Sequence, residues 1–136
     1  GSFTVNGTAL TVSVGAAAKL AVSTQVAGAT GGVAFTTQPK VTLQDAGGNT
    51  VTPTAATVVT AELSQLGAQG TLAGSTSATV GDVASSAPGV AAFSNLAINQ
   101  AKTGYILTFT SGTMKVDSSV FEVTVGARAK LAVTTN

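Results

Sequence analysis

The 136-residue chain contains no cysteine and no histidine. Without cysteine it has neither a disulfide framework nor a thiolate metal site, so its stability must come from packing and strand pairing. Without histidine it lacks the commonest general base and metal ligand, and every Ser-His-Asp arrangement is excluded. The five carboxylate side chains are far apart in sequence: Asp45, Glu62, Asp82, Asp117 and Glu122. We therefore expect a protein that is not an enzyme and that binds no cofactor.

Charged residues are also scarce, at 8% of the chain, and aromatic residues make up 4%. The net charge of +1 comes from scattered single residues with no Lys/Arg cluster, so we expect no nucleic-acid partner. No apolar run approaches the ~18 residues of a membrane span, and no segment has the order of a signal peptide. We expect no membrane insertion, and any export signal would lie outside these residues.

Apolar and polar residues alternate in short runs separated by Gly, Asn, Asp and Pro, which is typical of half-buried strands. The predicted inward positions are Leu20, Val22, Val33, Phe35, Val41, Leu43, Val59, Ala61, Leu63, Tyr105, Leu107, Phe109, Phe121, Val123 and Val125. Further strands are expected around Val80, Val90 and Phe93, and no stretch has a sustained helical period. The pattern predicts an all-β, immunoglobulin-like two-sheet antiparallel sandwich of about seven or more strands.

The two ends of the chain repeat each other. Residues 3–25 align without a gap on residues 114–136, at a constant offset of 111, and eleven of the 23 pairs are identical. The match is strongest where Gly-Ala-Ala-Ala-Lys-Leu-Ala-Val aligns with Gly-Ala-Arg-Ala-Lys-Leu-Ala-Val. A period of 111 fits a β-sandwich and exceeds the 20 to 50 residues typical of ankyrin, leucine-rich or propeller units.

This repeat predicts how the chain is divided. Residues 1–14 would be the last strand of a preceding repeat, of which Gly1 and Ser2 are alternatively a cloning remnant. Residues 15–126 would be one complete repeat, and 127–136 the first strand of the next. The unit could equally be counted from Phe3. The junction around Gly15 is too short and apolar for a flexible linker, so we expect stacked units with limited freedom. The alternative is that both ends fray when their partner units are missing.

Two local features carry structural predictions. Asp45-Ala-Gly-Gly-Asn49 has the composition of a turn, because Gly and Asn tolerate positive φ and Asp can cap the bend. Asp45 and Asn49 also place two oxygen-bearing side chains together, which makes them weak Ca²⁺ candidates; a self-capped turn is the favoured reading. Tyr105 begins the predicted penultimate strand, where a Tyr packs its ring on the core and bonds back to the preceding corner. The structural core residues are expected to be Tyr105, Phe93, Phe109, Phe121, Val41 and Leu43.

Three segments, taken together, resemble a known family. They are residues 36–51, with Gln-Asp-x-x-Gly-Asn-x-Val, residues 89–98, with Gly-x-x-x-Phe, and residues 103–112, with Gly-Tyr-x-Leu. The chain from about Gly15 to Gly126 resembles the bacterial immunoglobulin-like repeats of large surface proteins, and more distantly those of invasin and intimin type. Invasin-type repeats usually carry Pro after the Gly-Asn pair, where this chain has Thr50. The resemblance implies a β-sandwich that serves as a stalk spacer.

Other candidate sites have simpler interpretations. A Lys–Asn cross-link promoted by a buried acid, as in some bacterial surface sandwiches, would draw on Lys19, Lys40, Asn95, Asn99 and Glu62. Glu62 is expected to face outward, which speaks against that chemistry. Asn6-Gly-Thr8 matches a glycosylation sequon but also a hairpin turn. The glycine-rich segments 28–32 and 67–70 lead into no helix that could bind phosphate, so we interpret them as loops.

The favoured function is a non-catalytic stalk repeat of a bacterial extracellular protein, on the cell surface or secreted. Its expected partners are the adjacent repeats of the same chain. The alternative is an adhesive module that recognises a glycan, a host cell or a neighbouring cell through loops or Thr-rich strand faces. That alternative would be marked by exposed aromatic residues or polar clusters in loops.

Overall fold

The computed structural model describes residues 12–64, 70–82 and 84–126. The regular structure of these residues is entirely β, with no helix and therefore none that could span a membrane. The eleven strands are β1 (Lys19–Thr24), β2 (Lys40–Gln44), β3 (Val58–Leu63), β4 (Leu72–Ser75), β5 (Ser77–Thr79), β6 (Val90–Ala92), β7 (Ser94–Ile98), β8 (Lys102–Tyr105), β9 (Leu107–Ser111), β10 (Met114–Asp117) and β11 (Phe121–Val123).

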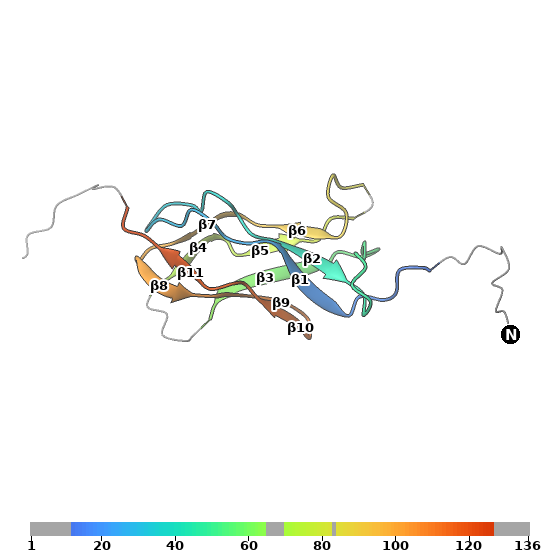
Figure 1. Cartoon of the computed structure of the whole chain (residues 1–136). Helices are drawn as coiled ribbons and strands as arrows, with labels where there is room; N and C mark the ends of the chain where they lie inside the picture. Colours follow the sequence, from blue (N-terminus) through green and yellow to red (C-terminus); the bar gives the residue numbers. More distant parts are fainter. Residues whose placement is uncertain (1–11, 65–69, 83, 127–136) are drawn as a thin grey trace, which may run out of the picture.

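The strands pair antiparallel in four sheets, ordered β1-β2-β6, β10-β9-β3-β5, β11-β8 and β4-β7. Several short strands are halves of longer ones, because single residues separate β6 from β7 (Phe93), β8 from β9 (Ile106) and β4 from β5 (Thr76). At these points the chain changes pairing partner. β6–β7 joins the sheets on one side of the molecule, and β8–β9 joins those on the other (Figure 1). The result is an all-β sandwich, which confirms the predicted fold class.

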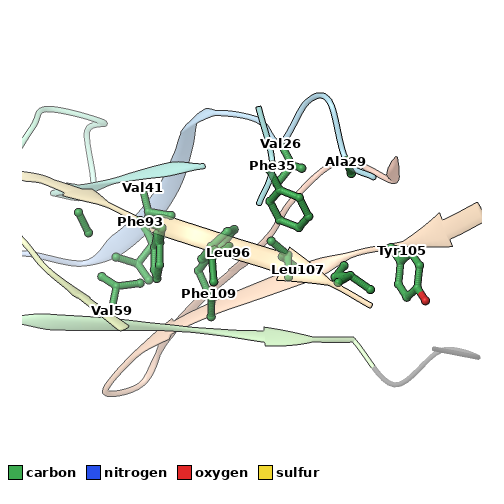
Figure 2. Packing of buried hydrophobic residues seen from close by; sticks show 14 of the residues in the cluster. Val26, Ala29, Phe35, Val41, Val59, Phe93, Leu96, Tyr105, Leu107 and Phe109 are labelled. Carbon is green, nitrogen blue, oxygen red and sulfur yellow. The ribbon is translucent and has the colours of Figure 1, made fainter. Parts of the chain in front are cut away.

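The two layers enclose one apolar core (Figure 2). The rings of Phe93 and Phe109 lie 5.2 Å apart between their centroids and join the layers, beside the fully buried Val41 of β2 and Val59 of β3. Alternation holds best in β3 and β9, where every second residue is buried. The predicted inward positions that are buried are Leu20, Phe35, Val41, Leu43, Val59, Ala61, Tyr105, Leu107, Phe109 and Val123; Val22, Leu63 and Phe121 pack against this core half-buried.

Two predicted inward residues face solvent instead. Val33 is 55% exposed because it closes a tight turn, in which its N–H donates to the carbonyl of Thr30, so the alternation of a strand does not apply. Val125 is 84% exposed because β11 ends at Val123 and no described strand covers the chain beyond it. Both predictions were wrong for the same reason: alternation predicts burial only where a residue lies in a paired strand.

The described chain enters and leaves at opposite ends of the sandwich (Figure 1). Residues 12–18 run up to β1 beside the turn that follows β2, where the N–H of Ala18 donates to the carbonyl of Gln44. At the other end, Thr124 follows β11 and exchanges hydrogen bonds with Ala29 and Gly31. Most of the predicted strands of neighbouring repeats, residues 1–11 and 127–136, and the sequon at Asn6 lie outside the described residues.

Candidate functional site

The turn from Asp45 to Asn49 is the most heavily hydrogen-bonded polar feature at the entry end. Asp45 Oδ1 accepts from the backbone N–H groups of Gly47 and Asn49, both at 2.9 Å, and the N–H of Gly48 donates to the Asp45 carbonyl at 3.1 Å. Gly48 has a φ of 89°, in the left-handed region that glycine adopts without strain. The Gly-Gly pair thus lets the chain fold back around the carboxylate, as the sequence predicted for a self-capped turn.

The same carboxylate reaches outside its turn. Asp45 Oδ2 accepts from the backbone N–H of Gly15 at 2.8 Å and from the side-chain amide of Asn49 at 3.0 Å, and that amide also contacts Oδ1 at 3.2 Å. Asp45 is only 5% exposed, and both of its oxygens bind amide hydrogens. Gly15 precedes Asp45 by 30 residues, so this turn ties the entering chain to the end of β2.

These bonds lower the pKa of Asp45 well below its ordinary value of 3.8. The largest cause is the side-chain amide of Asn49, followed by the backbone N–H groups of Gly15 and Asn49; burial opposes them, and the N–H of Gly47 adds to them. Each amide hydrogen stabilises the charged form of the carboxylate and not the neutral one. Asp45 is therefore held ionised by dipoles of the protein itself.

The residues present do not fit the Ca²⁺ site that Asp45 and Asn49 suggested. Calcium needs six to eight oxygen ligands, but the Asp45 oxygens are occupied by hydrogen-bond donors and Asn49 turns its amide hydrogens toward them. In residues 12–64, 70–82 and 84–126, no three acidic side chains gather where a metal could bind. A cation would have to displace the donors that shape the turn.

Tyr105 forms the second feature, at the opposite end of the core. Its side chain is 2% exposed, and its hydroxyl donates to the main-chain carbonyl of Gln100 at 3.1 Å. Its ring packs on Phe121 with 6.0 Å between centroids, and Phe121 in turn meets the ring of Phe35 edge-on at 5.8 Å. Figure 2 shows Tyr105 beyond Leu107 and Phe109 along the same side of the core. This is the contact with the preceding corner that its position in the sequence predicted.

The five residues considered for a Lys–Asn cross-link do not form a buried set. Their side chains are all exposed: Lys19, Lys40, Glu62, Asn95 and Asn99. Glu62 faces solvent on β3, as the alternation predicted, so it does not supply a buried acid. Asn99 has a local role instead, because its Oδ1 accepts from the backbone N–H of Thr71 at 2.7 Å.

The surface of the described residues includes two open grooves. One, of about 500 Å³, lies between β3 and the segment leading into β4 and includes Thr60, Glu62 and Thr71. The other, of about 340 Å³, is more apolar and lies at the entry end, between Ala17, Pro53 and Met114. Among the described residues that line them, neither groove has an aromatic side chain or a pair of carboxylates. Their linings offer apolar contact and hydroxyl groups but no acid–base pair.

Sequence reasoning missed two linking residues. Gln38 accepts from the backbone N–H of Leu96 at 2.9 Å and donates to the carbonyls of Leu96 and Phe35, so its amide links the segment before β2 to β7 beside the backbone bond from Phe35 to Leu96. Gly15 was noted only as part of the junction, and nothing near it in sequence indicates its bond to Asp45. The only available signal was the recurrence of Gly15 as Gly126 in the internal repeat.

Comparisons with known proteins add no relative to this description. No protein-family model matches the chain, and no curated protein or solved structure matches it.

Proposed function

We propose that this chain is a non-catalytic spacer: one unit of a tandem array, stacked end to end in an extracellular stalk of a bacterial surface or secreted protein. The observation that carries the proposal is the position of the two equivalent glycines. Gly15 and Gly126 are related by the 111-residue repeat; Gly15 lies beside Asp45 and Gly126 beside Gly31. The segments that contain them enter and leave the sandwich at opposite ends (Figure 1). A chain that enters at one end and leaves at the other extends with each added unit.

The dimensions of the unit support this function. The nearly continuous strand from Lys102 to Ser111 runs along the sandwich, and ten residues at about 3.3 Å each give roughly 33 Å per unit. Paired strands along this axis resist stretching because every step would break hydrogen bonds. An array of ten such units would reach several hundred ångströms.

The adhesive alternative has less support in the described residues. The described aromatic residues are Phe35, Phe93, Tyr105, Phe109 and Phe121, and none of them is exposed. Stacking of a sugar on an aromatic ring, which an adhesive module could use, therefore has no open ring to work with in this part of the chain. A glycan array with a signal above that of an unrelated sandwich would favour the alternative.

Small-angle scattering of a three-unit protein tests the spacer function. Its three units would be joined at the repeated glycine, so that Val125 of one unit is followed by Gly15 of the next. We expect an elongated particle with a maximum dimension of about 100 Å or more. A compact particle, or one that flexes over a wide range of shapes, would contradict a spacer.

A further inference from the structure

The two ends of the described chain are each held by hydrogen bonds, and in an array these bonds would lie on either side of one valine, Val125 or its repeat equivalent Val14. At the exit end, the N–H of Thr124 donates to the carbonyl of Ala29 at 3.0 Å, and the carbonyl of Thr124 accepts from Gly31 at 2.8 Å. Both peptide groups of Thr124 are thus attached to the unit that the chain is leaving. Gly126 follows two residues later.

At the entry end, the corresponding glycine is attached to the unit that the chain is entering. The N–H of Gly15 donates to Asp45 Oδ2 at 2.8 Å, and the next bond along the backbone is that of Ala18 to Gln44, also at 2.8 Å. Val14, just before Gly15, is 54% exposed, and its repeat equivalent Val125 is 84% exposed. Both valines belong to the same position in the repeat, between the two sets of bonds.

We propose that the Asp45 turn of each unit binds the backbone N–H of the junction glycine, and that this bond fixes the orientation of each unit relative to the preceding one. The partner is the preceding unit of the same chain, and the inference rests on the proposed spacer function. In this chain the bond is seen at Gly15. Gly126 is the glycine that the Asp45 equivalent of the following unit would bind.

The torsions that remain free show how much this bond controls. Peptide groups are planar, so only φ and ψ rotate. The last peptide group bonded to one unit contains the carbonyl of Thr124, and the first bonded to the next unit contains the N–H of the junction glycine. Only the φ and ψ of the valine between them, which are two torsions, separate these two peptide groups. Valine is β-branched and narrows these further. Without the bond, the next attachment is Ala18, and the φ and ψ of Gly15, Ala16 and Ala17 become free as well.

A carboxylate suits this role better than a neutral acceptor. A hydrogen bond from an amide to a charged oxygen is about twice as strong as one between neutral groups. The other oxygen of Asp45 accepts hydrogen bonds within its own turn, so the carboxylate cannot rotate away from Gly15 without losing the bonds from Gly47 and Asn49. The turn therefore presents a fixed, charged acceptor to the entering chain.

Substitutions at the junction glycine can test the loss of the hydrogen bond separately from the effect of an added side chain. Gly15 has no positive φ, and a Cβ there would lie 3.5 Å from the Cβ of Asp45, an ordinary contact. Gly15→Ala therefore keeps the N–H and fits, whereas Gly15→Pro removes the N–H. Asp45→Asn is a second variant, because it removes the charge and places an amide group where one of the two acceptor oxygens stood.

The test uses a two-unit protein in which residues 1–125 are followed by residues 15–136. Because the chain lacks cysteine, Lys115→Cys in each unit gives two exposed sites for spin labels on β10. Electron–electron distance measurements then report the spread of inter-unit distances. We expect narrow distributions for the parent and the junction Gly15→Ala protein, and an at least twofold broader one for Gly15→Pro and for Asp45→Asn in the second unit.

The outcomes distinguish the two proposals. If the parent distribution is narrow and both the Pro and the Asn variants match it, the Asp45 bond does not set the orientation and the inference fails, while the spacer function stands. If the parent distribution is itself broad, the stacked spacer fails and the inference with it. Thermal unfolding of each variant shows that the units are folded, so that a broad distribution reports the junction alone.

Discussion

Tyr105→Phe isolates one hydrogen bond at the corner of the core. The substitution deletes the hydroxyl that donates to the Gln100 carbonyl at 3.1 Å and leaves the ring in place. The ring is 2% exposed and packs against Phe121, so the Phe variant keeps the apolar contacts. No cavity larger than one oxygen atom is created.

The expected cost is about 1 kcal/mol, which is the typical net contribution of one hydrogen bond between uncharged groups. The cost should not reach the penalty for a stranded buried acceptor, because Gln100 is an exposed residue and water can replace the lost donor. In a domain of this size, a loss of about 1 kcal/mol lowers the melting temperature by roughly 4 °C.

Urea unfolding followed by circular dichroism measures this free energy, with equal slopes for the two proteins as the condition for comparing them. Gln100→Ala is the matched control: the acceptor is a main-chain carbonyl, so this variant should stay within about 0.5 kcal/mol of the parent. Unfolding free energies of the Phe variant and the parent that coincide would refute the structural role of the hydroxyl.

Three further predictions concern other contacts. Because the Asp45 pKa is lowered in the folded protein, the stability from its hydrogen bonds is complete above pH 4 and is lost as the pH falls below 3.8. Melting temperatures measured from pH 5 to pH 2 should therefore fall more steeply in the parent than in Asp45→Asn, and parallel curves would contradict this. Gln38→Ala should lower the free energy of unfolding in urea by about 1–3 kcal/mol, because it removes the acceptor of the Leu96 N–H and a donor to the Phe35 carbonyl; a loss under about 0.5 kcal/mol would show that the amide link is dispensable. Because Val33 is exposed, Val33→Ser should change the free energy of unfolding by less than about 0.5 kcal/mol; a loss of about 2 kcal/mol would show that Val33 is buried, as alternation predicted.

The parts of the fold that sequence predicted are those governed by local rules. Val59 and Ala61 alternate with exposed residues because β3 has one face on the core, and Tyr105 bonds a carbonyl only five residues away. The Asp45 turn also follows from its own residues, because two glycines and an Asn follow the Asp. Such features depend on spacing, which the sequence shows directly.

The features that the sequence did not predict depend on contacts between residues that are distant in sequence. Gly15 meets Asp45 across 30 residues, and Gln38 meets Leu96 across 58. No local pattern marks either pair, since a backbone N–H is present at almost every residue and a Gln is unremarkable on its own. The error at Val33 has a related origin, because the turn that exposes it lies between Gly31, which bonds to Thr124, and Phe35, which bonds to Leu96.

The most direct test of the spacer is the increase in length per unit. Small-angle scattering of one-, two- and three-unit proteins, each joined at the repeated glycine, gives the maximum dimension for each. A stack entered and left at opposite ends predicts a constant increase of about 33 Å per unit. Increments that shrink with each added unit would mean that the units fold back on one another, and the chain would not be a spacer.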